Sequence, residues 1–538
     1  MRSLLAICLF LLTGVLAHSQ PGVKALPTFT NVQEKLYSSD WLVYPPKQKA
    51  ALFYSADGKE LILYNGLLKR SFRISPNVAC TDFQNMINGQ QLLRAVKPEA
   101  RITLNGKEYN IGGLYGQTEN AYLVTDWLEK FTANSSDFIV TGFTQSSISP
   151  FLNWKTSFWT TNKNQPTGKH LSFIYESSLK ELHNIQVIVH YELYDGIPLI
   201  IKWVAVENHS SNSFKIGRVV NEMLALVEEE SAVVGKPEVM KKQHGIYVET
   251  NYAFNNAMRY DISDQTTHWK TDSSYTSQVN YYYETPCLLE VYPEKAPGID
   301  LKPGEIFKSV RTHELLMDGY DRERRGLAIR SMYRSIAPWT SSNPIFMHLV
   351  SKNNEEVKTA IDQCVATGYE AVILSFGSHL NMEDSSVANI LQWKMLAEYA
   401  HSKKISIGGY SLFSSRRISD EDDVVDPITG KPGGAFFGNA PCFGSKWGFA
   451  YREKIKYFFS KTGFDIWEND GPYPGDLCAS TIHPGHKGLD DSQWIQMNIQ
   501  KELYHWLNER GIYINAPDWY FLDGTNKIGI GYREVNFS

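Results

Sequence analysis

The sequence changes its hydrophobic pattern near residue 345, and this change restricts the folds that the chain can adopt. Between about Ala50 and Val310, short β-rich runs are separated by turn signals such as Asn65-Gly66, without convincing long helices. This pattern predicts a large antiparallel β-sandwich. After Ile345, five apolar strand segments alternate with four amphipathic helical segments, which predicts βα units and a parallel sheet.

The alternation predicts where each strand and helix of the second half begins and ends. We expect strands at 345–350, 371–374, 405–410, 464–467 and 512–515, and helices at 353–367, 385–402, 446–461 and 491–509. A complete (β/α)8 barrel takes roughly 250 residues, which is more than the chain has after residue 345. We therefore expect a (β/α)8-type TIM barrel that is incomplete, as in a fragment of a longer protein.

The N-terminal residues have the pattern of a secretory signal peptide. A charged start (Arg2) precedes an apolar run and the small-residue segment Val15-Leu16-Ala17. We expect cleavage near Ala17–Gln20 and a secreted or periplasmic protein, and no later segment is apolar for long enough to cross a membrane. The expected division is a signal peptide at 1–20, a β-sandwich (supersandwich) domain at 21–318, a helical linker at 319–344 and a partial (β/α) barrel catalytic domain at 345–538.

Composition narrows the classes of partner. A net charge of −5 and a pI near 6.3 argue against nucleic acid, which requires a concentrated basic surface. The aromatic share of 13% is high; core packing accounts for most of it, but sugar-binding proteins also expose Trp and Tyr. We expect a carbohydrate partner, an oligosaccharide or glycoconjugate, and no cofactor, and the sequence leaves the oligomeric state open.

The segment from Gly463 to Cys478 is the strongest candidate for a catalytic site. Its apolar strand is followed at once by Glu468 and Asp470, and chemistry in barrels is carried by the carboxyl ends of strands. Asp470 is either a nucleophile for a sugar or a residue that caps the turn at Gly471. Glu468 is either a substrate-binding or pKa-shifting carboxylate, or the partner of a basic residue.

Several other side chains near the predicted strand ends are candidates for substrate binding. We expect Trp467 and Tyr473 to be sugar platforms, and the remaining candidates are Ser375, Tyr410, Asp476, His483 and His486. The loop that contains Cys478, His483 and His486 also has the residue types of a metal site. Its spacing fits no standard zinc module, so we expect no metal, with Asp490 capping the following helix.

The segment from Asn439 to Asp470 resembles the retaining α-galactosidase-type hydrolases, glycoside hydrolase families 27 and 36 of clan D. Cys442, Gly444 and Ser445 match a loop of that family, and Gly463-Phe464-Asp465 matches its strand start. The resemblance places Asp470 at the nucleophile position and implies a β-supersandwich before the barrel. It also implies a Cys442–Cys478 disulfide.

Other family features are missing or displaced. The family has Lys two residues before the nucleophile, where this chain has Glu468, and paired Asp after strand two, where it has Ser375-Phe376. The acid/base of the family comes from around strand six, which leaves Glu534 as a candidate and Asp518 as an alternative. The resemblance thus implies a retaining hydrolase of α-linked sugars whose sugar specificity differs from that of the family.

Two alternatives remain open from the sequence. The first is a catalytically inactive carbohydrate-binding protein on the same architecture, because the Lys and the paired Asp are replaced. The second is a metal-dependent hydrolase or lyase that uses the loop with His483 and His486.

Overall fold

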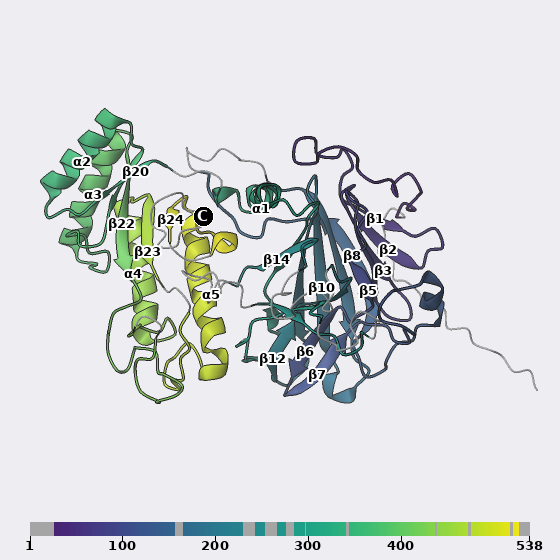
Figure 1. Cartoon of the computed structure of the whole chain (residues 1–538). Helices are drawn as coiled ribbons and strands as arrows, with labels where there is room; N and C mark the ends of the chain where they lie inside the picture. The colour runs from purple at the N-terminus through teal and green to yellow at the C-terminus, as the bar shows by residue number, and fades with distance from the viewer. Residues whose placement is uncertain are drawn as a thin grey trace, which may run out of the picture.

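The computed structural model consists of a β-sandwich and a smaller parallel α/β part that lie side by side (Figure 1). The structure describes residues 26–156, 165–229, 243–252, 266–275, 285–295, 297–340, 344–435, 438–471, 475–516 and 520–526. The expected signal peptide therefore lies outside the described residues.

The sandwich is built from antiparallel sheets that share one apolar core. One sheet has the order β1 (Ala51–Tyr54), β2 (Glu60–Tyr64), β3 (Leu68–Arg73), β4 (Ala79–Asn85). The largest has the order β14 (Ile246–Thr250), β19 (Thr312–Leu316), β11 (Leu199–Asn208), β10 (Ile185–Tyr194), β9 (Gly168–Glu176), β8 (Ile139–Ser147), and β18 (Ile306–Lys308) also pairs with β11. A third sheet has the order β17 (Ile299–Leu301), β12 (Phe214–Val220), β6 (Ala100–Leu104), β7 (Lys107–Ile111). A fourth has the order β15 (Thr267–Lys270), β16 (Leu288–Val291), β13 (Glu222–Leu226), β5 (Leu93–Ala95).

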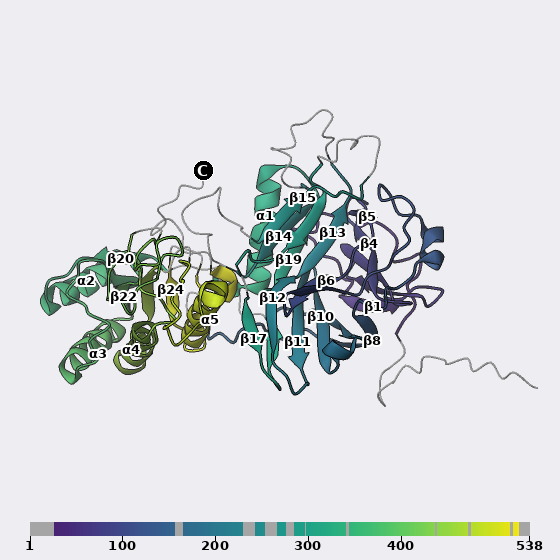
Figure 2. The ribbon, with the colours of Figure 1, turned by 90° about the horizontal axis from the view of Figure 1, so that it is seen from below.

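Helix α1 (Arg322–Ile336) connects the sandwich to a sheet of five parallel strands in sequential order. The strands are β20 (Phe346–Leu349), β21 (Ala371–Leu374), β22 (Ser406–Leu412), β23 (Ile466–Asp470) and β24 (Tyr513–Asn515). The helices are α2 (Asn354–Thr367), α3 (Val387–Ser402), α4 (Lys446–Thr462) and α5 (Leu489–Asn508). Each of these helices contacts the next one, so all four follow one face of the sheet (Figure 2).

This arrangement matches the alternation read from the sequence. Sequential parallel order with helices on one face is also the arrangement of a barrel wall. Among the described residues, however, the sheet is open, with β20 and β24 at its edges. Closure into a (β/α)8 barrel therefore stays a prediction.

Local capping signals fix the helix that precedes the candidate site. Ser445 Oγ accepts a hydrogen bond from the backbone N–H of Gly448 at the start of α4, at 3.0 Å. Gly463 ends the helix with a φ of 78°, a left-handed conformation that favours glycine. The chain then turns into β23, which continues through Asp470 rather than ending at Trp467 as predicted.

The start of α5 corrects a second prediction. The side chain of Asp491, not of Asp490, accepts hydrogen bonds from the backbone N–H groups of Lys487 and Gly488. Asp490 instead pairs with Lys215 of the sandwich at 2.8 Å. Capping from the third helical position is a recognised alternative to the N-cap itself, which here is Gly488.

The two parts of the molecule are packed against each other along α5. The Trp494 ring lies 6.3 Å from that of Tyr252 and 5.5 Å from that of Phe307, centroid to centroid. The segment between the two parts adds a contact, since Trp339 Nε1 donates a hydrogen bond to the Phe521 carbonyl at 2.8 Å. The parallel sheet is therefore held by the sandwich on one side.

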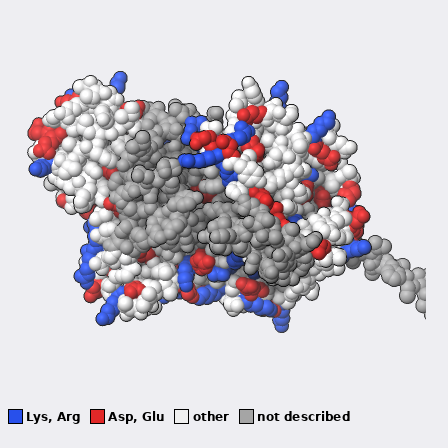
Figure 3. Space-filling model, viewed as in Figure 1, with Lys and Arg blue, Asp and Glu red and all other residues white. Residues whose placement is uncertain are grey.

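Charges of both signs are interspersed on the described part of the face shown in Figure 3. Of the helices in the described part of the chain, none has both the length and the apolar character to cross a membrane.

Candidate active site at the ends of the parallel strands

Strand register decides which of the predicted residues can act together. In the sheet, Tyr410 pairs with Glu468, Leu412 with Asp470, and Glu468 with Asn515. Because side chains alternate along a strand, Glu468 and Asp470 lie on one face of β23. Trp467 lies on the opposite face, toward the helices.

Asp470 is held at the carboxyl end of β23 by its neighbour strand. The Tyr410 hydroxyl donates a hydrogen bond to Asp470 Oδ2, and the Asp470 carbonyl accepts one from the Phe413 N–H at 2.8 Å. The ring of Phe376, which follows β21, packs edge-on against Tyr410 at 5.4 Å and is 66% exposed. Three successive strands thus contribute to the surroundings of one partly exposed carboxylate.

Glu468 lies deeper on the same face and is fully buried. Its Oε1 is 3.2 Å from His348 Nε2, a contact at ion-pair distance if the imidazole is protonated. The angles of this contact do not make it a hydrogen bond, and within the described residues neither carboxylate oxygen accepts one. The Asn515 side chain, on the next strand, is also buried. Among the described residues, neither its Nδ2 nor its Oδ1 has a hydrogen-bond partner.

Buried polar atoms without partners are rare in folded proteins, because each one loses its hydrogen bonds to water. Glu468 and Asn515 are adjacent in the register, so their unpaired atoms form one polar surface inside the end of the sheet. A bound molecule with hydroxyl groups could donate to the carboxylate and both donate to and accept from the amide.

A charged pair borders the same end of the sheet. Arg416 and Glu383 form an ion pair at 2.9 Å, and the guanidinium stacks on Trp447 at 4.7 Å. Burial raises the pKa of Tyr451, the charges of Glu383 and Asp470 raise it further, and that of Arg416 lowers it. The Arg416 guanidinium also lies 6.0 Å from the centre of the Tyr451 ring.

Trp467 is not a sugar platform. Its side chain is fully buried, donates a hydrogen bond from Nε1 to Ser411 Oγ at 2.9 Å, and packs against Phe459 and Tyr504. The strand alternation that brings Glu468 and Asp470 to one face necessarily turns Trp467 into the layer between sheet and helices. Among the described residues around these strand ends, Phe376 has an exposed aromatic ring.

Cys442 and Cys478 are free thiols, so the predicted disulfide is not formed. Each is instead paired with a histidine: Cys442 Sγ is 3.3 Å from His486 Nε2, and Cys478 Sγ is 3.4 Å from His483 Nδ1. The two cysteines nevertheless lie close together, since all four residues form one buried cluster. The prediction that His483 contacts substrate is wrong, because its second nitrogen is bonded to the Glu421 carbonyl.

His486 faces the same buried cluster through Nε2, which also corrects its predicted contact with substrate. Hydrogen bonds with Cys442, His483 and His486 lower the pKa of the Cys478 thiol, whereas burial and the neighbouring Cys478 raise that of Cys442.

The remaining predicted residues have mixed outcomes. Ser375 directly follows β21 and donates its backbone N–H to the Leu349 carbonyl at 2.9 Å. Asp476 is half-buried, and its carbonyl accepts a hydrogen bond from Gln496 Nε2 at 2.9 Å. Tyr473, Asp518 and Glu534 lie outside the described residues.

Sequence reasoning missed His348, Glu383 and Arg416. His348 gave only a weak signal, as one polar residue inside the apolar strand Phe346–Leu349. Glu383 and Arg416 lie in loops after β21 and β22, and their pairing depends on the tertiary fold.

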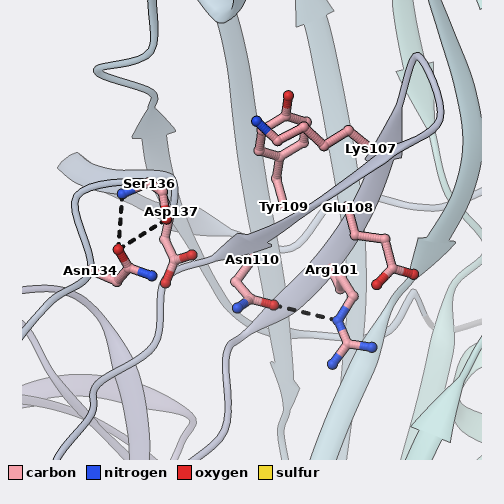
Figure 4. A pocket seen from close by; sticks show the side chains of 8 residues that line it. All are labelled: Arg101, Lys107, Glu108, Tyr109, Asn110, Asn134, Ser136 and Asp137. Carbon is pink, nitrogen blue, oxygen red and sulfur yellow. Dashed lines mark hydrogen bonds between the residues drawn. The ribbon is translucent and has the colours of Figure 1, made fainter.

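The sandwich has a polar pocket of its own, of about 470 Å³ (Figure 4). It is lined by Arg101, Lys107, Glu108, Tyr109, Asn110, Asn134, Ser136 and Asp137. All of these belong to β6, β7 or the loop before β8, so the pocket is separate from the ends of the parallel strands.

The chain is similar to known proteins in its fold and not in its sequence. No family model matches the chain, and neither does any curated protein. Among solved structures, the glycoside hydrolase family 36 α-galactosidase AgaB from Geobacillus stearothermophilus aligns with a TM-score of 0.55 and 12% identity, over 87% of this chain and 72% of that one. The chain has an α-galactosidase-like fold.

Two more structures agree with this fold. A variant of the α-galactosidase AgaA from Geobacillus stearothermophilus, in complex with raffinose, has a TM-score of 0.54 and 12% identity over 87% of this chain and 75% of that one. The α-galactosidase from Lactobacillus brevis gives 0.53 and 10% over 87% and 72%. At such identities the likeness establishes the α-galactosidase-like fold and leaves substrate and activity open.

Proposed function

We propose that the protein is a glycoside hydrolase that cleaves α-linked sugars with retention, with Asp470 as the nucleophile. The observation that carries this proposal is the position of Asp470: a partly exposed carboxylate at the carboxyl end of β23, oriented by the Tyr410 hydroxyl. The fold shared with α-galactosidases supports it, as does the match of Gly463-Phe464-Asp465 and Asp470 to the family motif.

In the proposed reaction, an Asp470 oxygen attacks the anomeric carbon while the glycosidic oxygen leaves with a proton from a general acid. Water then releases the sugar from the resulting ester. The hydrogen bond from Tyr410 fixes the carboxylate rotamer and stabilises its ionised form. A retaining pair requires the acid/base about 5 Å away, and Glu534 and Asp518 remain the candidates for that role.

Sugar recognition would involve the buried polar surface of Glu468 and Asn515, together with the exposed Phe376 ring. A carboxylate accepts from sugar hydroxyls, whereas the Lys that the family has at the position of Glu468 donates to them. Structures with a similar fold have been determined with raffinose and with stachyose. We expect α-linked oligosaccharides as substrates, with a hydroxyl pattern different from galactose.

The second candidate is a carbohydrate-binding protein without catalytic activity, which rests only on the replacement of that Lys by Glu468. A metal-dependent hydrolase or lyase is not favoured. His483 and His486 point at two thiols within a buried cluster, and four protein ligands would leave a metal no open position for substrate.

The test compares Asp470→Asn with Asp465→Asn in the full chain, on a panel of aryl α-glycosides. Asp465 lies at the other end of the same strand and is bonded to the Ile407 N–H at 2.9 Å and to His401 at 2.8 Å. We expect kcat/KM to fall at least about 10³-fold for Asp470→Asn and less than about threefold for Asp465→Asn. Turnover by Asp470→Asn at the normal rate would contradict the proposal, and glycan binding without turnover by the unmodified protein would favour the second candidate.

A further inference from the structure

The four residues Cys442, Cys478, His483 and His486 converge on one point. One ligand atom from each, two Sγ, one Nδ1 and one Nε2, lies within 4.8 Å of all the others, and all four residues are buried. They come from two loops: Cys442 lies between β22 and α4, and the other three lie between β23 and α5. The fold therefore assembles a Cys2His2 set that is dispersed in the sequence.

Three of the six distances between these atoms are close to those of a tetrahedral zinc site. With Zn–S about 2.3 Å and Zn–N about 2.0–2.1 Å, a tetrahedron has S···N edges of about 3.5 Å and N···N edges of about 3.4 Å. The two S···N distances are 3.3 and 3.4 Å, and the two nitrogens are 3.3 Å apart. These three edges agree with the tetrahedron to about 0.2 Å.

The tautomer of His483 also fits a metal ligand. His483 Nε2 lies 3.0 Å from the Glu421 carbonyl, which can only accept, so this nitrogen carries the hydrogen. In the neutral ring, Nδ1 then presents a lone pair to the centre of the cluster. Zinc-bound histidines usually donate their second N–H in this way, which orients the ring.

The surroundings bring the two loops unusually close. Gly444 and Gly485 are in direct contact, since a Cβ added to Gly485 would lie 2.7 Å from the Gly444 Cα. A Cβ on Gly444 would lie 2.7 Å from His486 Cδ2. A backbone N–H group also supports one of the sulfurs, since Val425 N is 3.4 Å from Cys478 Sγ.

Simple hydrogen bonding explains the cluster less well. Two separate thiol–imidazole pairs would account for the S···N contacts, but not for the 3.3 Å approach of His483 Nδ1 to His486 Nε2. With the His483 proton on Nε2, only His486 could donate in that contact. A common centre for all four atoms is what a metal ion requires and a chain of hydrogen bonds does not.

We propose that Cys442, Cys478, His483 and His486 bind one structural Zn²⁺ ion. The two thiols lose their protons to solvent when the metal binds, and two thiolates and two neutral imidazoles then balance its charge, as burial requires. Four protein ligands make the site closed, so the ion fastens the loop after β22 to the loop after β23 and does not act on substrate. Both loops begin at the strand ends that hold Tyr410 and Asp470.

The first experiment measures metal in the full chain, produced without a polyhistidine tag and purified under reducing conditions without chelator. We expect elemental mass spectrometry to find about one zinc per chain. After replacement of zinc by Co²⁺, we expect the intense visible absorption bands of a tetrahedral site and the charge-transfer bands of its thiolates. Fewer than about 0.1 transition-metal ion per chain after zinc has been supplied would overturn the proposal. A Cys442–Cys478 disulfide in the protein as isolated without reductant would overturn it too.

Variants assign the metal to these residues. Cys478→Ser and His486→Asn should retain less than about a tenth of the zinc, because each removes one of four ligands. The matched control is Cys364→Ser, which alters a buried thiol that lies outside the cluster, against the Ala371 carbonyl, and should keep about one zinc. Undiminished zinc or unchanged Co²⁺ bands in Cys478→Ser would contradict the assignment. These readouts do not depend on glycosidase activity, so the two proposals can fail separately.

Discussion

Two fully buried glutamates, Glu222 in the sandwich and Glu468 in the parallel sheet, have opposite surroundings. Glu222 lies between two cations, 2.9 Å from Arg70 and 2.7 Å from Lys202. Burial alone would raise its pKa, but Arg70 and Lys202 lower it below the ordinary value. Among the described residues, Glu468 has His348 as its one ion-pair contact and accepts no hydrogen bond.

The Glu222 carboxylate stabilises the fold through its ion pairs, whereas the Glu468 carboxylate is available to a ligand. Removing one partner of a buried ion pair leaves the other uncompensated, so Glu222 is part of the stability of the sandwich. A buried carboxylate without donors destabilises the fold, and such groups are retained where binding or catalysis uses them. The same substitution at the two positions should therefore have opposite consequences.

Glu222→Gln should have the largest effect on stability. It places a neutral amide beside Arg70 and Lys202, whose remaining carboxylate neighbours are Glu314 at 2.9 Å and Glu99 at 3.8 Å, so we expect the free energy of unfolding to fall by about 3 kcal/mol. Urea unfolding followed by circular dichroism measures this. Activity of the folded fraction at low temperature should be unchanged; a loss below about 1 kcal/mol would show that the network is dispensable.

Glu468→Gln should leave the free energy of unfolding unchanged or raise it, because a buried charge without donors is removed. Catalysis should suffer instead, with kcat/KM on the best α-glycoside reduced about 100-fold, or about 2.7 kcal/mol. Steady-state kinetics and urea unfolding on the same preparation check both parts. A variant that is destabilised like Glu222→Gln but fully active when folded would remove the distinction.

Acid should weaken the sandwich through its buried histidines. Burial, with the charges of His170, Arg311 and Lys308, lowers the pKa of His190 to about 3, and burial lowers that of His313 to about 3. Below pH 6.5 the unfolded chain takes up protons that the folded chain does not, so stability falls as the pH falls toward 3.

Each of these histidines should cost about 1.4 kcal/mol for every pH unit below its unfolded pKa. His190→Gln should remove the contribution of one histidine. The free energy of unfolding in urea should then differ less between pH 7.5 and pH 5.5 than it does in the unmodified chain. An identical difference in both proteins would contradict the assignment to His190.

The smallest effect is expected for the exposed pair of Lys215 and Asp490 between the sandwich and α5. Both side chains are largely exposed, so Lys215→Ala should change the free energy of unfolding by no more than about 1 kcal/mol, and less at high salt. A larger, salt-independent loss in urea unfolding would mean that this contact, rather than the apolar packing of Trp494, holds the two parts together.

Much of the fold could be predicted because periodicity is a local property. The alternation of apolar segments located the parallel strands and their helices, and it placed Glu468 and Asp470 at the end of β23. The same alternation, applied one residue earlier, would have assigned Trp467 to the helix-facing layer. That error came from reading the strand as ending too soon.

The thiol–imidazole cluster could not be predicted in the same way. Cys442 is separated from Cys478 by α4 and β23, so its proximity to His486 is created only by the packing of two loops. Neighbouring strand ends suggested that the two cysteines meet, but a spacing cannot distinguish a disulfide from a shared set of ligands. His348 was missed because one polar residue in an apolar strand is a weak signal.

The most direct test of the account is covalent labelling of Asp470. The full chain would be incubated with a fluorinated, slowly released α-glycosyl fluoride, digested at low pH and examined by peptide mass spectrometry. We predict that one sugar is attached, as an ester, to the Asp470 side chain, and that Asp470→Asn acquires no label. An unlabelled protein that nevertheless hydrolyses α-glycosides, or a label on another carboxylate, would contradict the assignment of Asp470 as the nucleophile.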